Sequence, residues 1–391
     1  MIPEIREKFN SCFKQENFNK FINNIQKVIR RDIDFRICET PLFLDTKTTD
    51  SLINAANDIA DQVKQIISDD FADIKIPEKY IVPNEGKHPL FLQIDFALTL
   101  GNSNDFLPQL IELQGFPSLY NFQAFIDQKI REYFEIPSGF RSYFNDLNYN
   151  SYIELLKTVM IGEHEPENVI LLEINPKGQK TWIDFFLAEK QLGIKSICIS
   201  DVMQRGNNLF YKKDNIEVPI ERIYNRVIFD ELETSPVKPS FNFYDDLNVE
   251  WLSHPNWFFK ISKNILPMIR SKYSPQSIYL NELNEYPENL SEYVLKPLYS
   301  FAGSGVKIDI TKELLDGISN KQNYILQKKV EYAPVIKTPD GYSKTEIRMM
   351  YLWKDKQILV NNLLRVSKGK MIGVDYNKNK TWVGANIVYH R

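Results

Sequence analysis

The chain is poor in the residues that usually build metal sites and disulfide frameworks. Only four of its 391 residues are histidine, and they do not occur in the HExxH or HxH spacings typical of zinc sites. Its three cysteines, Cys12, Cys38 and Cys198, are widely spaced and form no CxxC pair. This pattern argues against a disulfide framework and favours free thiols in a reducing compartment. If the chain is an enzyme, its chemistry must come from carboxylates, lysines and arginines.

Long apolar runs and an excess of one charge are also missing. No run approaches the roughly 18 apolar residues of a membrane span, and the start, MIPEIREKFN, lacks the apolar core of a signal peptide. Lys plus Arg is 48 and Asp plus Glu is 51, a formal charge of −3, whereas proteins that bind nucleic acid or acidic membranes need a basic surplus. We therefore expect a soluble, cytoplasmic protein without nucleic-acid or membrane partners. The oligomeric state is not readable from the sequence.

The chain has enough apolar side chains for a core in several parts. Hydrophobic residues make up 43% of it and aromatic residues 13%, and at about 150 residues per domain its length suggests two or three units. Apolar residues recur at helical spacing in several segments. This predicts helices over 16–30, over 50–67 with Asp50 as the N-cap, over 121–134 and over 258–272.

Other segments follow the two-residue period of strands. PLFLQIDFALTL predicts a half-buried strand with one apolar face, and PQLIELQG predicts a second strand after a turn-rich loop. VILLEI, the helix TWIDFFLAEKQLG and IKSICIS together predict a parallel βαβ unit. A Pro-rich linker over 233–246 follows. Beyond it, strands are expected in EYVLKPL, GVKIDI, NYILQKKV, TEIRMMYLW and QILVNNLLRV.

Two carboxylates are expected to face each other in the first predicted hairpin. If its turn centres on residues 103–104, Asp95 opposes Glu112 and Gln93 opposes Gln114, so that all four project from one face. Opposed like charges are destabilising, and a cation between them would relieve the repulsion. Oxygen ligands of this kind suit Mg²⁺. The alternative is a solvated polar face with a different register.

A lysine followed by small residues gives a second candidate site. Lys296 ends a predicted strand, and the loop Phe301–Gly305 comes next. Small residues let backbone N–H groups approach phosphate oxygens, and the lysine adds positive charge. The loop is not a Walker A motif, because no GK[ST] follows the glycines. An ordinary hairpin turn is the alternative.

A third candidate lies on the last two long strands. Glu346 and Arg348 share one face of TEIRMMYLW, and Arg365 lies on the next strand. Arginines on a sheet face can hold a phosphate or carboxylate at two points. A cross-strand ion pair is the alternative.

Taken together, VLKP, the glycine loop, YILQKKVEYAP, EIR and LLRV resemble the nucleotide-binding lobe of the ATP-grasp superfamily. In ordinary members the metal-binding strand pair follows this lobe, whereas here the comparable pattern QID…IELQGFPS precedes it. That order is similar to the circularly permuted branch, which includes glutathionylspermidine synthases and eukaryotic-type glutathione synthetases. The resemblance covers most of residues 90–391, at the level of motifs. It matches nothing in the first 85 residues, and no segment resembles the cysteine amidase of some relatives.

The resemblance implies an α+β fold in three regions. Residues 1–165 would form an N-terminal α+β region with the metal-binding strands, 166–240 a Rossmann-like pre-ATP-grasp unit, and 241–391 the nucleotide-binding lobe.

The resemblance also implies roles for particular residues. Asp95, Glu112 and Gln114 would be Mg²⁺ ligands, although the third position is usually Asn. Lys263 and Lys260 both fit an expected second phosphate lysine, with Lys263 preferred. The ATP contacts would be Lys263, Lys296, Gly303, Ser304, Gly305, Gln327 and Glu331, and the catalytic residues Lys296 and Arg365.

The implied activity is ATP- and Mg²⁺-dependent ligation of a small-molecule carboxylate to an amine through an acyl phosphate. The alternatives are a phosphotransferase on the same fold and a catalytically silent nucleotide-binding protein. Candidate substrate contacts are Arg36, Ser118 and Arg348. For Arg36, an ion pair with Glu39 or another acid is the competing interpretation.

Overall fold

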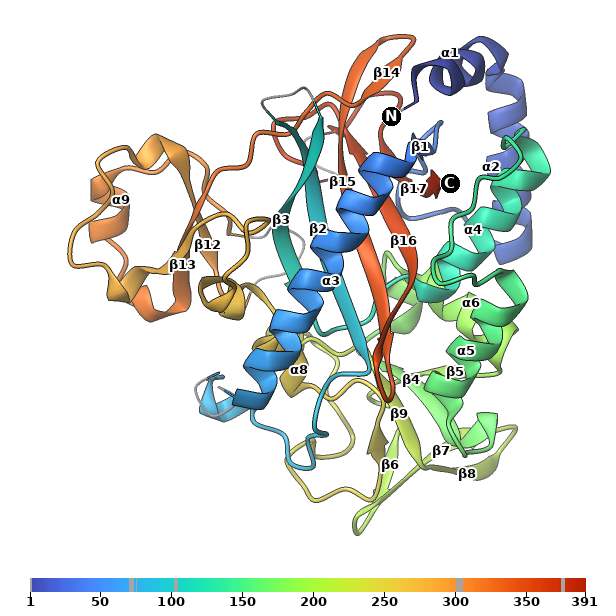
Figure 1. The fold of residues 1–391 in the computed structure, drawn as a ribbon. Coiled ribbons are helices and arrows are strands. Elements are labelled where there is room, and N and C mark those ends of the chain that lie inside the picture. Colours follow the sequence, from blue (N-terminus) through green and yellow to red (C-terminus); the bar gives the residue numbers. More distant parts are fainter. Residues whose placement is uncertain (1, 70–73, 75, 102–104, 300–304, 374–376) are drawn as a thin grey trace.

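The centre of the molecule is one antiparallel sheet built from both halves of the chain. The computed structural model describes residues 2–69, 74, 76–101, 105–299, 305–373 and 377–391. The strand order is β17–β16–β15–β2–β3, with β14 beside β15 (Figure 1). The strands are β2 (Phe91–Leu100), β3 (Phe106–Gln114), β14 (Ile336–Thr338), β15 (Gly341–Trp353), β16 (Gln357–Ser367) and β17 (Gly384–Asn386). Predicted strands that are far apart in the sequence are therefore neighbours in this sheet.

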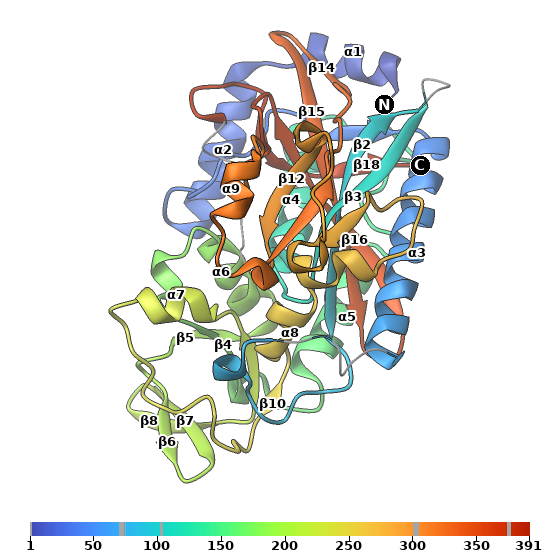
Figure 2. The same ribbon diagram turned by 90° about the vertical axis from the view of Figure 1, so that its left-hand side faces the viewer.

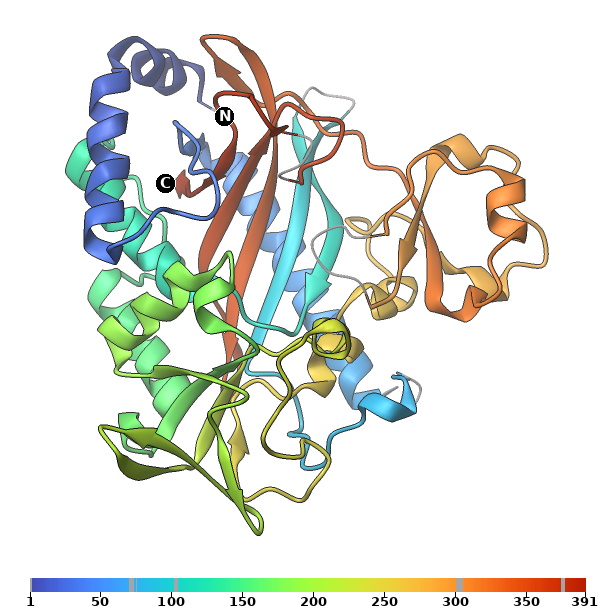
Figure 3. The same cartoon turned by 180° about the vertical axis from the view of Figure 1, so that it is seen from behind.

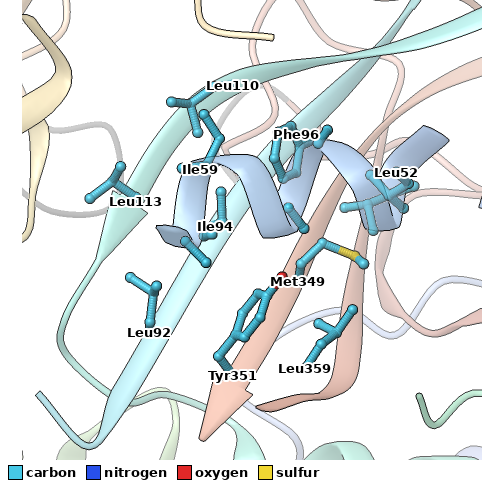
Figure 4. Packing of buried hydrophobic residues seen from close by; sticks show 14 of the residues in the cluster. Leu52, Ile59, Leu92, Ile94, Phe96, Leu110, Leu113, Met349, Tyr351 and Leu359 are labelled. Carbon is cyan, nitrogen blue, oxygen red and sulfur yellow. The ribbon is translucent and has the colours of Figure 1, made fainter. Parts of the chain in front are cut away.

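Helix α3 (Thr46–Asp69) covers one face of the central sheet. Alternate residues of β2 and β15, among them Ile94, Phe96 and Met349, are fully buried and pack with Leu52 and Ile59 of the helix (Figure 4). Burying a side chain of this size contributes roughly 1.5–3 kcal/mol. Because a slip of one residue would turn these side chains to the other face, this layer fixes the strand register.

The predicted start of α3 is wrong by about one turn. The helix begins at Thr46 rather than after Asp50, and the carboxylate Oδ1 of Asp45 accepts the backbone N–H of Thr48 at 2.8 Å. The first turn is polar, so apolar spacing could not reveal it, yet Thr48 and Thr49 are buried by tertiary packing. Asp45 therefore occupies the capping position that the sequence suggested for Asp50.

The face of the central sheet opposite α3 carries polar side chains, and those of β2 that point to it, Gln93 and Asp95, are buried as well. Gln93 is 0% exposed and Asp95 is 1% exposed, so the expectation of a half-buried β2 is wrong. Other parts of the chain lie against this face. The ammonium of Lys296 donates to the carbonyl of Ile111 at 2.9 Å, and that of Lys263 lies 3.4 Å from Oε2 of Glu112.

A second sheet is parallel and lies beside the central one. Its order is β10–β9–β4–β5, and helix α6 (Trp182–Leu192) connects β4 to β5. These parallel strands and their connecting helix confirm the predicted βαβ unit. The strands are β4 (Val169–Glu173), β5 (Lys195–Cys198), β9 (Arg222–Asn225) and β10 (Glu250–Trp251). The chain runs from β4 outward to β5, then returns to place β9 on the other side of β4, so the strand order reverses at β4.

Helices and a small antiparallel sheet complete this side of the molecule. Aromatic residues of α2 and α4 share a buried cluster with β1 and β18, which pair in parallel. The helices α2 and α4 begin and end within one residue of their predicted bounds. The elements are α1 (Pro3–Cys12), α2 (Gln15–Ile29), β1 (Leu42–Leu44), α4 (Tyr120–Tyr133), α5 (Tyr149–Ile161), β6 (Met203–Arg205), β7 (Asn208–Lys213), β8 (Ile216–Ile220), α7 (Phe229–Thr234) and β18 (Val388–His390).

A separate three-stranded sheet stands out from the central one in Figures 1 and 3 and lies in front of it in Figure 2. Its order is β11–β13–β12, and it has a small apolar cluster of its own. Its elements are β11 (Ser277–Tyr279), β12 (Tyr293–Pro297), α9 (Lys312–Asp316) and β13 (Tyr324–Lys328). The predicted strand GVKIDI is wrong: Lys307 makes one bridge to Leu295. The chain then turns into α9, which is capped by Thr311.

The predicted helix over 258–272 is also wrong. The segment forms the short helix α8 (Asn256–Lys260) and then the 3₁₀ helix η5 (Lys263–Met268). The hydroxyl of Ser262 accepts the N–H of Asn264 and restarts the chain in a new direction, and Pro267 has no N–H to continue a helix.

The predicted region boundaries at 165/166 and 240/241 stay a prediction. The structure shows that strands from the first and last of these regions share the central sheet. A search of the helices among the described residues finds none with the length and apolar character to cross a membrane.

Candidate functional site

The polar face of the central sheet begins with the hairpin of β2 and β3. Asp95 pairs with Glu112 and Gln93 pairs with Gln114, as their spacing predicted. The register then shifts by one residue, because Phe96 pairs with Leu110 and leaves Ile111 as a bulge. The predicted turn centre, 103–104, lies outside the described residues. The alternative of a different register at the two carboxylates is wrong.

Strands β15 and β16 extend the polar face sideways. Glu346 pairs with Ala97 on one side and with Arg365 on the other, and Arg348 pairs with Asp95. Since residues two apart on a strand share a face, Glu346 and Arg348 point to the same side as Asp95. Four neighbouring strands thus bring their charged residues to one buried surface.

The two arginines bind the carboxylates of this face. The guanidinium of Arg348 donates to Asp95 through two nitrogens, Nε to Oδ1 at 2.6 Å and Nη2 to Oδ2 at 2.7 Å. Arg365 pairs with Asp95 as well, and its Nη2 lies 2.5 Å from the Oε1 of Glu346. The cross-strand ion pairs that the sequence left as an alternative are therefore present.

Two lysines reach the same face from outside the sheet. The Nζ of Lys263, at the start of η5, lies 3.4 Å from Oε2 of Glu112. Lys296 on β12 donates to the bulge carbonyl of Ile111. The competing lysine, Lys260, pairs with Glu85 at 3.0 Å instead. The structure thus brings the preferred lysine, Lys263, to the carboxylate pair.

The pKa values of these groups follow from burial and from the surrounding charges. Burial alone would raise the pKa of Glu112, but Lys263, Arg365 and Lys296 outweigh it and hold this pKa at about 2. Burial lowers the pKa of Lys296 to about 8, against the opposing charge of Glu112. Burial, with Asp95 and Glu112 nearby, raises the pKa of Glu346.

The polar face carries a surplus of positive charge. It has three carboxylates and four cationic side chains, so it has one positive charge in excess when all of them are ionised. These residues are Asp95, Glu112 and Glu346 against Lys263, Lys296, Arg348 and Arg365. A buried surface with this balance is suited to bind an anion such as a phosphate chain.

A cavity of about 420 Å³ is linked to the charged residues through Tyr332, which lines it and contacts Glu346. Thr99 and Gln109 line it from the polar face, and Glu331 and Tyr332 line it from the segment after β13. Gln327 on β13 is buried, and its Nε2 has no hydrogen-bond partner among the described residues. The volume lies within the range of small-molecule pockets.

Sequence reasoning missed two members of this site. Tyr332 donates from its hydroxyl to Oε2 of Glu346 at 2.8 Å. Gln93, named earlier only as a partner of Gln114, accepts from Nη1 of Arg348 at 3.0 Å. The even spacing of Gln93 and Asp95 was the available signal for Gln93, whereas nothing local marked Tyr332.

The remaining predicted residues lie elsewhere or outside the description. Arg36 forms an ion pair with Glu39, the competing interpretation for it. The backbone carbonyl of Ser118 accepts from Gln93 at 2.7 Å. Gly303 and Ser304 lie outside the described residues. Gly305 has φ +72°, a conformation that favours glycine.

The carboxyl ends of the parallel sheet form a second polar region. Glu173 ends β4, and Arg226 directly follows β9, at the point where the strand order reverses. Ligands of open α/β sheets bind at such a point. Arg226 donates to the carbonyl of Pro117, in the loop after β3. Burial raises the pKa of Glu173 to about 7.

The polar face has donors that fit Mg²⁺. Mg²⁺ usually takes one or two carboxylates together with substrate phosphates. Of the three predicted ligands, Glu112 and the Oε1 of Gln114 are oxygen donors of this kind, whereas guanidiniums contact both oxygens of Asp95. Gln114 donates its Nε2 to Glu112 at 3.1 Å, which leaves its own oxygen available. Within the described part of the chain, no three histidine, cysteine or acidic side chains gather as a protein-only metal site. The predicted metal ligands and nucleotide contacts stay predictions.

Comparison with known proteins concerns the fold. No protein-family profile and no curated protein match the chain. One solved structure that it resembles is a glutathione synthetase-like effector from Globodera pallida in its apo form, with 10% sequence identity and a TM-score of 0.54. The match covers 85% of this chain and 87% of that chain. The mixed α/β chain therefore has a glutathione synthetase-like fold.

Proposed function

We propose that this protein is an ATP- and Mg²⁺-dependent carboxylate–amine ligase of the circularly permuted ATP-grasp type. The observation that carries this proposal is the convergence of Lys263, Lys296 and Arg365 with Glu112 on one face that is buried except for part of Arg365 and Glu112. These residues come from η5, β12, β16 and β3. A bound phosphate chain needs several cations in one place. Stability of the fold does not explain the cluster, because buried ion pairs add little net stability.

The cavity after β13 is the proposed place of the nucleoside. Glu331 lines it. Gln327, next to the lining residue Lys328 but not itself in the lining, has a buried amide nitrogen without a partner among the described residues. Polar groups of this kind orient a base or ribose in an otherwise preformed pocket. The triphosphate would then extend along the polar face toward Lys296 and Lys263.

The chain's own residues hold the charges of the proposed reaction. Lys263 and Lys296 would bind phosphate oxygens, and Arg365 would contact the transferring phosphoryl group. Bound Mg²⁺, held by Glu112 and Gln114, would neutralise charge on that group. A substrate carboxylate oxygen bonds to the γ-phosphorus while the bond to the bridging oxygen breaks and ADP leaves. The amine nitrogen then attacks the acyl carbon, phosphate leaves, and the nitrogen loses a proton.

We propose that the substrate reaches the polar face through the second polar region. Arg226 is bonded to the loop that follows Gln114, so the reversal point of the parallel sheet adjoins the end of the metal-binding strand. Arg226 offers a charge for an acidic substrate group, and Glu173 offers one for an amine.

An ADP-release screen tests the proposal. The protein would be incubated with ATP, Mg²⁺ and pools of amino acids, polyamines and small peptides, followed by mass analysis for a new amide. We expect ADP and free phosphate in equal amounts, lost in Lys296→Met and kept in Lys356→Met, which removes an exposed lysine from the turn between β15 and β16. A phosphorylated product without free phosphate would instead identify a phosphotransferase.

One observation favours a second candidate, a nucleotide-binding protein without turnover. Gln114 stands at a position where the resemblance expects Asn, and its amide donates to Glu112. This contact occupies one oxygen of the proposed metal carboxylate. ATP binding without ADP release across all pools, and no gain in Gln114→Asn, would support the silent protein over the ligase.

A further inference from the structure

Both oxygens of Asp95 are held by guanidiniums. Arg348 binds Oδ1 and Oδ2 with two nitrogens, and Arg365 binds Oδ2 as well. The Asp95 side chain is 1% exposed and that of Arg348 is 8% exposed. A carboxylate has about four acceptor positions, and guanidinium nitrogens take three of those on Asp95. A metal ion at Asp95 would have one position left and would lie against two cations, which is unfavourable in a buried place.

A glutamine ties this arrangement to the loop after β3. Gln93 is fully buried and accepts from Nη1 of Arg348 through its Oε1. Its Nε2 donates to the carbonyl of Ser118 at 2.7 Å. One chain of hydrogen bonds therefore runs from Ser118 through Gln93, Arg348 and Asp95 to Arg365.

Arg365 is the end of this chain that a ligand can reach. Its side chain is 30% exposed, more than that of Asp95 or Arg348. Its Nε is buried and has no hydrogen-bond partner in the described part of the chain. Because this nitrogen is itself covered, an anionic ligand oxygen would meet the exposed part of the Arg365 side chain.

We propose that Asp95 is a positioning residue for Arg365 and not a metal ligand. Arg348 and Gln93 fix Asp95, Asp95 fixes the guanidinium of Arg365, and Arg365 receives the acidic group of the substrate. This assignment rests on the proposed function for the identity of that group, which is a carboxylate before phosphoryl transfer and an acyl phosphate after it. The link through Gln93 connects the orientation of Arg365 to the loop that carries Ser118.

Metal binding separates the two roles of Asp95. Mn²⁺ serves as the probe for Mg²⁺, and its binding in the presence of ATP is measured by electron paramagnetic resonance. Two matched carboxylate-to-amide variants are compared, Asp95→Asn and Glu112→Gln. We expect Glu112→Gln to weaken Mn²⁺ binding at least tenfold and Asp95→Asn to change it less than threefold. Equal losses in the two variants would overturn the proposal.

A second measurement needs no nucleotide. The Nε–Hε signals of Arg348 and Arg365 are observed by ¹⁵N NMR in wild type and in Gln93→Leu, which keeps every charge and has a side chain of similar volume. We expect both signals to be protected from solvent exchange in wild type, with inorganic phosphate shifting that of Arg365. Gln93→Leu should shift both signals and lower the protection of Arg365.

These two measurements also distinguish failure of the positioning role from failure of the proposed ligase function. A wild type that binds no Mn²⁺ and ATP would refute the ligase, and the arginine signals would still decide the positioning role. An Arg365 signal that is unprotected in wild type, or unchanged in Gln93→Leu, would overturn the positioning chain. Thermal unfolding of each variant establishes that it is folded.

Discussion

At the residue scale, the charges of the polar face are costly to bury and are retained as mutual partners. Glu112 remains ionised because Lys263, Arg365 and Lys296 more than offset its burial. Replacing a buried ion pair with apolar side chains of similar size is often neutral or stabilising. The fold therefore did not need this cluster, and binding an anion gives a physical reason for it.

The low pKa of Lys296 predicts how nucleotide binding depends on pH. Burial lowers this pKa to about 8, so the cation that would bind phosphate is lost as the pH rises through 8. If only the protonated lysine binds ATP, the apparent Kd should rise about tenfold between about pH 7 and pH 9, since the protonated fraction falls from about nine-tenths to about one-tenth. Isothermal titration calorimetry with Mg²⁺ and ATP over this pH range measures the change.

An arginine at the same position is the matched control. Lys296→Arg keeps a cation that does not lose its proton in this range, so its ATP affinity should vary less than threefold over the same pH values. An unchanged wild-type Kd from pH 7 to pH 9 would show that Lys296 does not contact the phosphates in its cationic form.

At the element scale, the start of α3 gives a clear test of local structure. Asp45 accepts the N–H of Thr48, whereas Asp50 is exposed in the second turn. Removing an N-cap costs about 1 kcal/mol, and an exposed side chain away from a cap contributes within about 0.5 kcal/mol. We expect Asp45→Ala to lower the free energy of unfolding in urea by about 1 kcal/mol and Asp50→Ala to leave it nearly unchanged. The reverse order would place the cap at Asp50.

The same elements show what the sequence could and could not reveal. The register of Asp95 with Glu112 was predictable because β2 and β3 are close together in the sequence, and α4 was predictable because its apolar spacing is local. The pairing of Arg348 with Asp95 was not predictable, because β15 pairs with β2 although the two strands are far apart in the sequence. The charged candidates could therefore be named in advance, while their partners, which decide their roles, could not.

Burial was the other property that local pattern misjudged. Alternation in β2 indicated one solvent-exposed face, yet Gln93 and Asp95 are buried. Gln93 contacts Ser118 and Arg348, and Asp95 contacts Arg348 and Arg365, all from distant parts of the sequence or from the loop after β3. An alternating strand reports which residues share a face and does not report what covers that face. The same limit explains why Tyr332 was missed, because its contact with Glu346 depends on where the segment after β13 lies.

At the scale of the whole molecule, the central sheet requires both halves of the chain. Strand β15 lies between β2 and β16, and β1 pairs with β18. A fragment of residues 1–165 would contain β2 and β3 but would leave the β15 side of β2 as an open edge, with its apolar face covered by α3 alone. Such an edge exposes unpaired N–H and C=O groups and promotes aggregation. We therefore expect the 1–165 fragment, expressed alone, to be insoluble or to show no cooperative thermal unfolding.

Co-expression provides the control for this fragment. Residues 1–165 produced together with residues 166–391 should form a soluble complex whose unfolding, followed by circular dichroism, is cooperative, because the second fragment supplies β15, β16 and β18. The positioning chain from Ser118 to Arg365 also crosses this division, so the ¹⁵N signals of Arg348 and Arg365 should return to their wild-type positions in the complex. A 1–165 fragment that folds cooperatively by itself would show that the first predicted region is an independent domain, and that its union with β15 follows folding and is not required for it.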